Sequence, residues 1–208
     1  MLEMKEGARA ADMARGKNKE RILQAGLDLM YVQGYNGTGI QEIADAAGVP
    51  KGSFYNYFKS KEAFAVEALA LYTEGLAEYL RGALLEGEES SALERMKALF
   101  ESWSATLFPK YGGKGCFAAN LTQEMARQSP TLQAALEEAY EALETPFVEN
   151  VRRAQAAGEI RGDLEPELLG KFIYNAWQGS QLRAKAMGGR EPLDQFASLI
   201  FGVLAGTT

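Results

Sequence analysis

The chain has 208 residues, 47% of them apolar, and a formal net charge of −6 at pH 7. It contains no histidine and one cysteine, Cys116, which excludes Ser-His-Asp and Cys-His catalytic sites, histidine-bearing zinc sites and a disulfide within the chain. No apolar run approaches the ~18 residues of a membrane-spanning helix, and the N-terminus lacks the apolar stretch of a signal peptide. The sequence therefore predicts a cytoplasmic protein with no membrane partner, metal or cofactor.

Charge is distributed unevenly along the chain. Residues 1–61 hold nine Lys or Arg and seven Asp or Glu, a balance of +2, whereas residues 62–208 hold thirteen and twenty-one, a balance of −8. Because nucleic acid is a polyanion, residues 1–61 are the part of the chain that it would approach.

The N-terminal quarter predicts short helices separated by glycines. Residues 1–16 are charged and aperiodic, which predicts a mobile arm. A helix then runs from Asn18 to Gly34, and a second begins with a capping box between Thr38 and Gln41 and ends at Gly48. A third, of barely two turns, continues through Tyr57. Ser60 is a good N-cap for a long fourth helix that ends at about residue 86.

The second and third helices, joined by a four-residue turn containing glycine, form a helix-turn-helix pattern over residues 17–61. Phe54 and Phe58 lie four residues apart and are expected to point into a small core. The opposite face is polar and suits base edges; its members are Lys51, Gly52, Ser53, Tyr55 and Asn56. Tyr57 and Lys61 follow where a phosphate would lie. The alternative is that the tyrosines only cover the core and the lysines only aid solubility.

Residues 62–208 predict further helices, with turns at residues 87–90 and 108–115 among others. No segment has the period-2 pattern of a strand, so the chain is expected to be all-α with about nine helices. Residues 62–208 would then form a helical bundle.

Residues 34–64, GYNGTGIQEIADAAGVPKGSFYNYFKSKEAF, resemble the N-terminal domain of the TetR family of bacterial transcriptional regulators, and the resemblance extends over residues 17–64. It implies a homodimer that binds a palindromic operator and is released by a small-molecule inducer. Family contacts to bases fall on Lys51, Gly52, Ser53, Tyr55 and Asn56. Family contacts to phosphates fall on Thr38, Gln41, Tyr57 and Lys61. A common variant has His where Asn56 stands, so the operator preference is expected to differ there.

The last two predicted helices are strongly apolar. Residues 166–188 mix small and large apolar side chains, and residues 191–206 carry a wide stripe that contains Leu193, Phe196, Ile200 and Leu204. Since no later segment covers them, they are expected to pack on a second copy as a four-helix interface. The alternative is that they form core within the subunit.

An inducer site would lie between helices of the bundle, with aromatic walls and a few polar groups. The candidates are Trp103, Cys116, Phe117, Asn120, Glu124, Tyr140 and Trp177. Cys116, near a helix N-terminus and beside Lys114, could be a sensor thiol, or it could be buried and inert. Its segment is similar to a GC...N...E pattern in TetR regulators of electrophile and unsaturated-acid detoxification.

Two other functions are less consistent with the sequence. An architectural or division-linked DNA-binding protein could use the same scaffold. A helical enzyme could use Cys116 or the paired Glu137 and Glu138, but adjacent helical carboxylates point about 100° apart and Cys116 has no histidine partner. The sequence thus favours a regulator rather than an enzyme.

Overall fold

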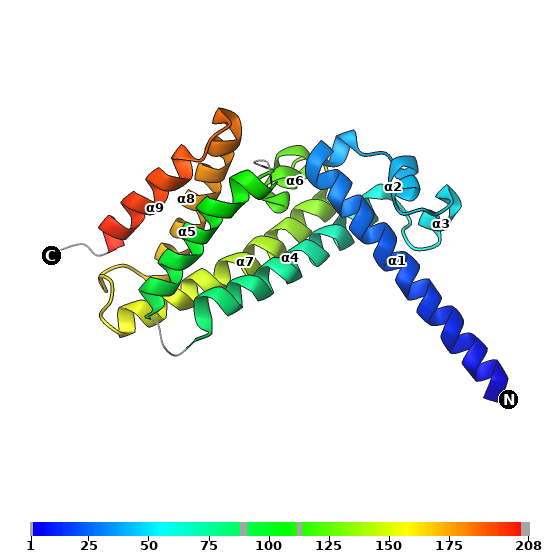
Figure 1. Ribbon diagram of the computed structural model, residues 1–208, viewed down its shortest axis with the longest axis horizontal. Coiled ribbons are helices and arrows are strands. Elements are labelled where there is room, and N and C mark those ends of the chain that lie inside the picture. The colour runs from blue at the N-terminus through cyan, green and yellow to red at the C-terminus, as the bar shows by residue number, and fades with distance from the viewer. Residues whose placement is uncertain (1, 88–90, 112–113, 205–208) are drawn as a thin grey trace. The chain divides into compact units, whose positions relative to one another are not determined.

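The computed structural model describes residues 2–87, 91–111 and 114–204, and the side chains of residues 16–87, 91–106 and 114–204. These residues form nine helices and no strand, which confirms the all-α prediction (Figure 1). The helices are α1 (Leu2–Gly37), α2 (Ile40–Ala46), α3 (Lys51–Tyr55), α4 (Lys61–Leu85), α5 (Ala92–Tyr111), α6 (Phe117–Met125), α7 (Pro130–Ala156), α8 (Pro166–Met187) and α9 (Glu191–Leu204). Of the turns predicted at 87–90 and 108–115, residues 88–90 and 112–113 lie outside the described residues. The second turn begins later than predicted, because residues 108–111 continue α5 to Tyr111.

The helices group into two compact units. The N-terminal unit comprises Met1–Tyr72 and Leu121–Ala135, and the C-terminal unit comprises Thr73–Asn120 and Leu136–Thr208. The first division falls between Tyr72 and Thr73, whereas the sequence predicted a boundary between residues 61 and 62. The difference arises because the first turns of α4 supply core residues to the N-terminal unit. Three helices, α4, α6 and α7, contribute residues to both units.

Helix α1 begins well before the position expected from periodicity. Residues 2–16, expected as an arm, continue the helix without a break; their many Ala, Met, Lys, Arg and Glu residues are good helix formers. Gly34 interrupts it with φ 80° and ψ 168°, as the predicted helix end requires.

Aromatic side chains form the core beneath α3. The rings of Phe54, Phe58 and Phe64 are buried, with centroids 4.9–5.4 Å apart. A Cβ on Gly26 of α1 would lie 2.3 Å from Phe64 Cζ, so the ring occupies the space that any larger residue at 26 would need. The predicted inward orientation of Phe54 and Phe58 is therefore confirmed.

A second aromatic core fills the C-terminal unit. Phe100 of α5 lies at its centre, with ring centroids 4.9 Å from Trp177 and 5.0 Å from Phe196. Asn150 of α7 is fully buried, and its Nδ2 donates to the carbonyls of Leu84 and Ala92, which fixes the end of α4 beside the start of α5.

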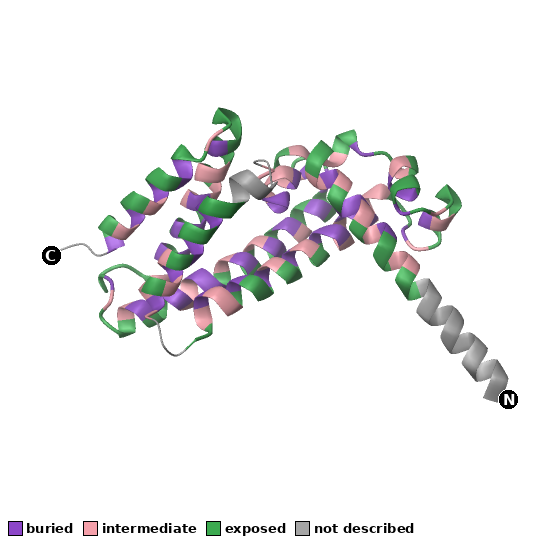
Figure 2. Ribbon diagram, in the orientation of Figure 1, coloured by how far each residue is buried: buried purple, intermediate pink, exposed green. Residues whose placement is uncertain are grey.

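Two local predictions are corrected. Gly39, not Thr38, is the N-cap of α2: the Thr38 hydroxyl donates instead to the Gly34 carbonyl at 2.8 Å, and Gln41 donates to Asp45. The α9 stripe predicted for the dimer is core of the subunit, since Leu193, Phe196, Ile200 and Leu204 are buried within the chain's own C-terminal unit. Figure 2 shows exposed residues on the remaining side of α9. Among the described residues no helix is long and apolar enough to span a membrane.

Candidate DNA-binding and ligand-binding sites

The turn between α2 and α3 presents the third helix with its polar face outward. Gly48 takes φ +64° in this turn, and Arg21 of α1 braces it by donating to the Ala47 carbonyl at 2.7 Å. Pro50, with φ −60°, precedes the first residue of α3. Because Phe54 and Phe58 face the core, the residues between them are forced to the opposite side of this short helix.

Most of the predicted DNA-contacting residues lie on that outward side. The exposed residues are Lys51, Gly52, Tyr55 and Asn56, whereas Ser53 and Tyr57 are half-buried at the flanks. Nothing lies within 4 Å of a Cβ built on Gly52, so the backbone there is open to a close approach by a ligand. The surface defined by residues 51–53 and 55–57 is called the α3 face below.

The other three predicted contacts differ from one another. Thr38 is buried, with its hydroxyl engaged on Gly34, so it offers no exposed donor. Gln41 is exposed on α2. Lys61 is half-buried, and its Nζ lies 4.4 Å from the centroid of the Tyr35 ring. Burial lowers the pKa of Lys61, and the nearby Glu124 carboxylate opposes that shift.

Glu124, predicted in the ligand site, instead belongs to the N-terminal unit. Its two carboxylate oxygens accept hydrogen bonds from the backbone N–H of Tyr35 at 2.9 Å and of Asn36 at 2.8 Å. A Cβ on Gly34 would lie 2.4 Å from Glu124 Oε1, so this contact and the positive φ both require glycine. We call this arrangement the Glu124 anchor. It is made by the last turn of α6, and no feature of the sequence indicates it.

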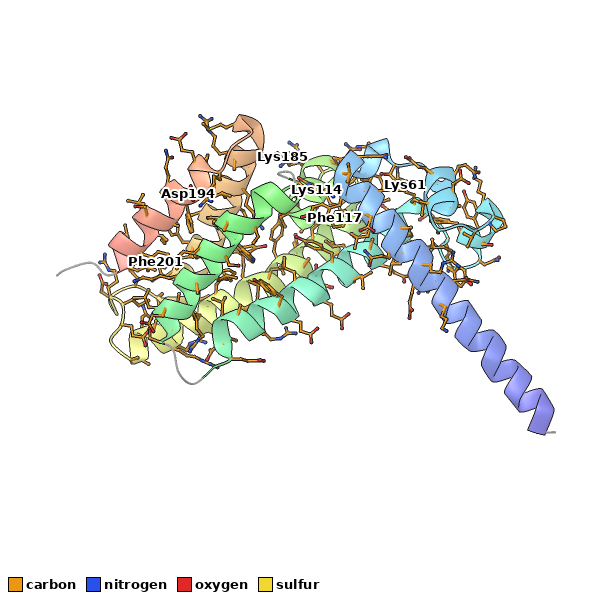
Figure 3. The ribbon with its side chains drawn as sticks, in the orientation of Figure 1. Lys61, Lys114, Phe117, Lys185, Asp194 and Phe201 are labelled. Carbon is orange, nitrogen blue, oxygen red and sulfur yellow. The ribbon has the colours of Figure 1, made fainter. Side chains whose placement is uncertain are left out.

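The other ligand-site candidates all belong to the C-terminal unit. The rings of Trp103 and Trp177 stack with centroids 5.4 Å apart and an interplanar angle of 28°. Phe117 is buried at the start of α6. Asn120 donates to the carbonyl of Lys114 and accepts from Lys185 Nζ at 3.2 Å; Figure 3 labels Lys114, Phe117 and Lys185.

Cys116 and Tyr140 are linked through a residue that sequence analysis did not select. Tyr174 of α8 is almost fully buried, and burial raises its pKa well above the usual range, with the adjacent Cys116 and Tyr140 adding to the shift. Gln178 Nε2 donates to the Tyr174 hydroxyl at 2.6 Å. The 174–178 spacing on one helix face is the signal that would have identified this pair.

An open groove runs along the exposed side of α9. It is lined by Arg190, the residue before α9, and by seven residues of α9: Glu191, Asp194, Gln195, Ser198, Leu199, Gly202 and Val203. A groove walled by a single helix does not enclose a small molecule, so it fits a partner surface better than a ligand site.

Comparison with known proteins identifies both parts of the chain. Residues 22–68 match the family described as "Bacterial regulatory proteins, tetR family", and residues 92–200 match "Tetracyclin repressor-like, C-terminal domain". The HTH-type transcriptional repressor DhaR of Mycobacterium sp. strain GP1 is 34% identical over 94% of this chain and 96% of its own length. The HTH-type transcriptional repressor NemR of Escherichia coli K12 is 30% identical, covering 90% and 94%.

Solved structures agree with these matches. A regulatory protein TetR from Rhodobacter sphaeroides superposes with a TM-score of 0.81 at 32% identity, covering 89% of this chain and 97% of that one. The reduced form of E. coli NemR superposes with a TM-score of 0.84 at 26% identity, covering 92% and 99%. Such regulators bind DNA operators and are not enzymes, and they typically dimerise and bind small ligands. On this evidence the chain is a DNA-binding transcriptional regulator and belongs to the TetR family.

Proposed function

We propose that this protein is a cytoplasmic repressor that binds a palindromic operator as a homodimer and is released by a small-molecule inducer. The observation that carries the proposal is the α3 face: exposed Lys51, Tyr55 and Asn56 on a short helix held from behind by buried phenylalanines.

The chemistry of the α3 face suits a major groove. An asparagine amide can pair with the N6 and N7 edge of adenine, and an aromatic side chain can contact the thymine methyl group. Lys51 adds charge, and the open backbone at Gly52 allows base edges to come close. Gln41 and Tyr57, at the border of this face, are proposed to contact phosphates.

The second copy is proposed to dock on the outward sides of α8 and α9. Large apolar side chains there are solvent-exposed in the single subunit: Leu168, Phe172, Leu182, Leu199 and Val203. They are distinct from the buried α9 stripe, and two of them, Leu199 and Val203, line the open α9 groove. Such exposure is unusual for a monomer, and regulators of this family typically dimerise; both observations support a second copy as the proposed occupant.

The test begins with selection of bound sequences from a pool of random double-stranded DNA. An inverted repeat with half-sites about one helical turn, ~34 Å, apart is expected. Affinity for that site is then measured by fluorescence anisotropy for the wild type and variants. Asn56→Ala should weaken binding by about 1–3 kcal/mol and relax preference at one position of each half-site. Tyr57→Ala should weaken binding to all sequences alike.

Glu138→Gln, a change of an exposed residue in the C-terminal unit, provides the control and should leave affinity unchanged. Selection of no repeat, or Asn56→Ala with undiminished affinity and unchanged preference, would contradict the assignment of the α3 face. Occupancy of many dispersed chromosomal sites would favour an architectural protein instead.

A further inference from the structure

Two buried side chains of the C-terminal unit end in polar atoms without partners. Trp177 of α8 is 1% exposed and Ser104 of α5 is 2% exposed, yet neither the Trp177 Nε1–H nor the Ser104 hydroxyl makes a hydrogen bond. A buried polar group left unpaired costs about 1–3 kcal/mol, so native proteins rarely retain one without a purpose. An indole N–H can only donate, so Trp177 Nε1–H is open to an acceptor on a bound molecule.

Two acceptors follow Trp177 on α8. Gln178 and Gln181 each have a buried Oε1 without a partner. Gln181, four residues after Trp177, lies on the same side of the helix, whereas Gln178, the next residue, points about 100° away from it. For Gln178 the amide nitrogen is already used, because it donates to the Tyr174 hydroxyl at 2.6 Å. The free carbonyl oxygen can therefore accept from a donor on a bound molecule.

Flat apolar walls surround these polar atoms. The ring centroid of Trp177 lies 5.4 Å from that of Trp103 and 4.9 Å from that of Phe100. Ser104 follows Trp103 directly and is one helical turn beyond Phe100, so its hydroxyl belongs to the same side of α5. Aromatic walls of this kind favour a planar or unsaturated body over a branched one.

The charge of the surroundings restricts the ligand further. Among the described residues no charged side chain is buried. Lys185, two turns after Gln178, is exposed and donates to Asn120 Oδ1 at 3.2 Å. An ion bound among the aromatic rings would lack a counter-charge, and its desolvation would be unfavourable.

We infer that this site binds a small, neutral, planar molecule that carries a hydrogen-bond acceptor next to a donor, as in a carboxamide. The acceptor would pair with Trp177 Nε1–H and the donor with Gln181 Oε1, one helical turn away, while the Ser104 hydroxyl serves either. The inference rests on the proposed function, which requires an inducer, and it specifies the class of that inducer. Entry is expected past Trp103, which is 9% exposed, and past Tyr79, whose half-exposed ring stacks on it with centroids 6.4 Å apart.

Direct binding tests this inference without DNA, so its failure is distinguishable from failure of operator binding. The chain's two tryptophans are Trp103 and Trp177, and both lie in the site, so intrinsic fluorescence reports on it alone. The probes are benzamide, benzoate and benzamidinium, which share size and shape but are neutral, anionic and cationic. At millimolar concentration benzamide should bind at least about tenfold more tightly than either ion.

Two variants test whether Trp177 Nε1–H is the donor to the ligand. Because each variant removes a tryptophan, binding is followed by saturation-transfer NMR, which does not depend on tryptophan fluorescence. Trp177→Phe keeps an aromatic wall but removes the donor, and it should weaken benzamide binding by about threefold to tenfold. Trp103→Phe removes an indole whose ring serves as a wall and should change affinity less than threefold. Thermal melts confirm that both variants are folded.

Three results would overturn the inference: no benzamide binding, equal or tighter binding of benzoate or benzamidinium, or equal benzamide affinity for wild type and Trp177→Phe. Tighter binding of benzoate would point instead to a carboxylate ligand held by Lys185. If bound water, and not a ligand, satisfies the unpartnered polar atoms of Trp177, Ser104 and the glutamines, benzamide will not bind.

Discussion

At the scale of single residues, Glu124 illustrates a role that spacing along the chain does not indicate. Its helix position suggested a pocket-lining acid, but both carboxylate oxygens accept backbone N–H groups 88 and 89 residues away in sequence. The anchor holds the chain where α1 turns at Gly34 toward α2. It thereby fixes the segment that leads into the helix-turn-helix and places Tyr35 beside Lys61.

Glu124→Gln should loosen this segment. A glutamine has one acceptor oxygen where the carboxylate has two, so one of the amides of Tyr35 and Asn36 loses its partner, at a cost of about 1–3 kcal/mol. Hydrogen exchange at those two amides, measured by NMR, should accelerate about tenfold or more. Gln123→Ala, at the exposed neighbouring position, is the control. Unchanged exchange in Glu124→Gln would show that the anchor contributes nothing in solution.

Tyr174 gives a residue-scale prediction about pH. Burial, with Cys116 next in importance, raises its pKa well above the ordinary value near 10. Between about pH 10 and the raised pKa the unfolded tyrosine is ionised while the folded one keeps its proton, so the unfolded state binds fewer protons. The free energy of unfolding therefore falls as pH rises through this window, by up to about 1.4 kcal/mol per pH unit.

Tyr174→Phe should remove that contribution. Urea unfolding between pH 9 and 11 should show a shallower alkaline decline for the variant, together with lower stability at pH 7 because Gln178 loses its partner. The exposed Tyr79→Phe should retain the wild-type slope. An equal slope in Tyr174→Phe would mean that this hydroxyl ionises as readily in the folded state as in the unfolded one. The role of the neighbouring Cys116 as a sensor thiol stays a prediction, which this experiment does not address.

At the scale of helices, replacing either of two helical glycines with alanine is expected to change the free energy of unfolding in opposite directions. Gly26 in α1 and Gly75 in α4 both lie within helices, where alanine is intrinsically better by about 1 kcal/mol. A Cβ on Gly26 would meet Phe64 at 2.3 Å, whereas a Cβ on Gly75 has nothing within 4 Å.

Gly26→Ala should therefore lower the free energy of unfolding by about 1–3 kcal/mol, because overpacking outweighs helix propensity. Gly75→Ala should raise it by about 0.5–1 kcal/mol. Urea denaturation followed by circular dichroism measures both. A stabilised Gly26→Ala would imply that the Phe64 ring moves aside freely and that α1 and α4 are packed less tightly than the contact indicates.

Helix existence was predictable because local signals agree with the fold. Gly34 and Gly48 both take positive φ where periodicity ended, and Ser60 accepts from the Ala63 N–H as an N-cap should. The start of α2 was misplaced because Thr38 and Gly39 are both acceptable caps and the choice depends on a bond to Gly34. The α3 face followed from two phenylalanines four residues apart.

The proposed ligand site could be predicted from the sequence only in part. Trp103 and Trp177 were chosen as aromatics of the helical bundle, but their stacking depends on packing between α5 and α8, which brings together two residues 74 positions apart. Ser104, Gln178 and Gln181 differ from surface polar residues only in being buried without partners, which no periodicity reveals.

At the scale of the whole molecule, the apolar residues of α9 that sequence analysis expected at a dimer interface are not the ones left exposed on the subunit. An amphipathic helix with a wide stripe has two usable sides, and α9 places Leu193, Phe196 and Ile200 in its own core while Leu199 and Val203 stay exposed. If the subunit is half of a dimer, the exposed side is the one that a second copy covers.

Leu199→Glu tests this with little risk to the subunit itself. Leu199 is 70% exposed, so a glutamate there should cost the single subunit less than about 0.5 kcal/mol. In a dimer each of the two copies would bury one such carboxylate in the interface without a counter-charge. Sedimentation velocity should show a dimer for wild type, a monomer for Leu199→Glu at micromolar concentration, and a dimer for the control Ala105→Glu on α5.

Operator binding should fall with the dimer. The Leu199→Glu subunit keeps an intact α3 face, so it should still bind a half-site, but it loses the second half-site that a preformed dimer places within reach. Affinity for the full palindrome should therefore drop at least about 100-fold, while affinity for an isolated half-site stays within about twofold of wild type. A monomer that binds the palindrome as tightly as wild type would separate dimerisation from DNA recognition, and a persistent dimer would move the interface away from the exposed side of α9.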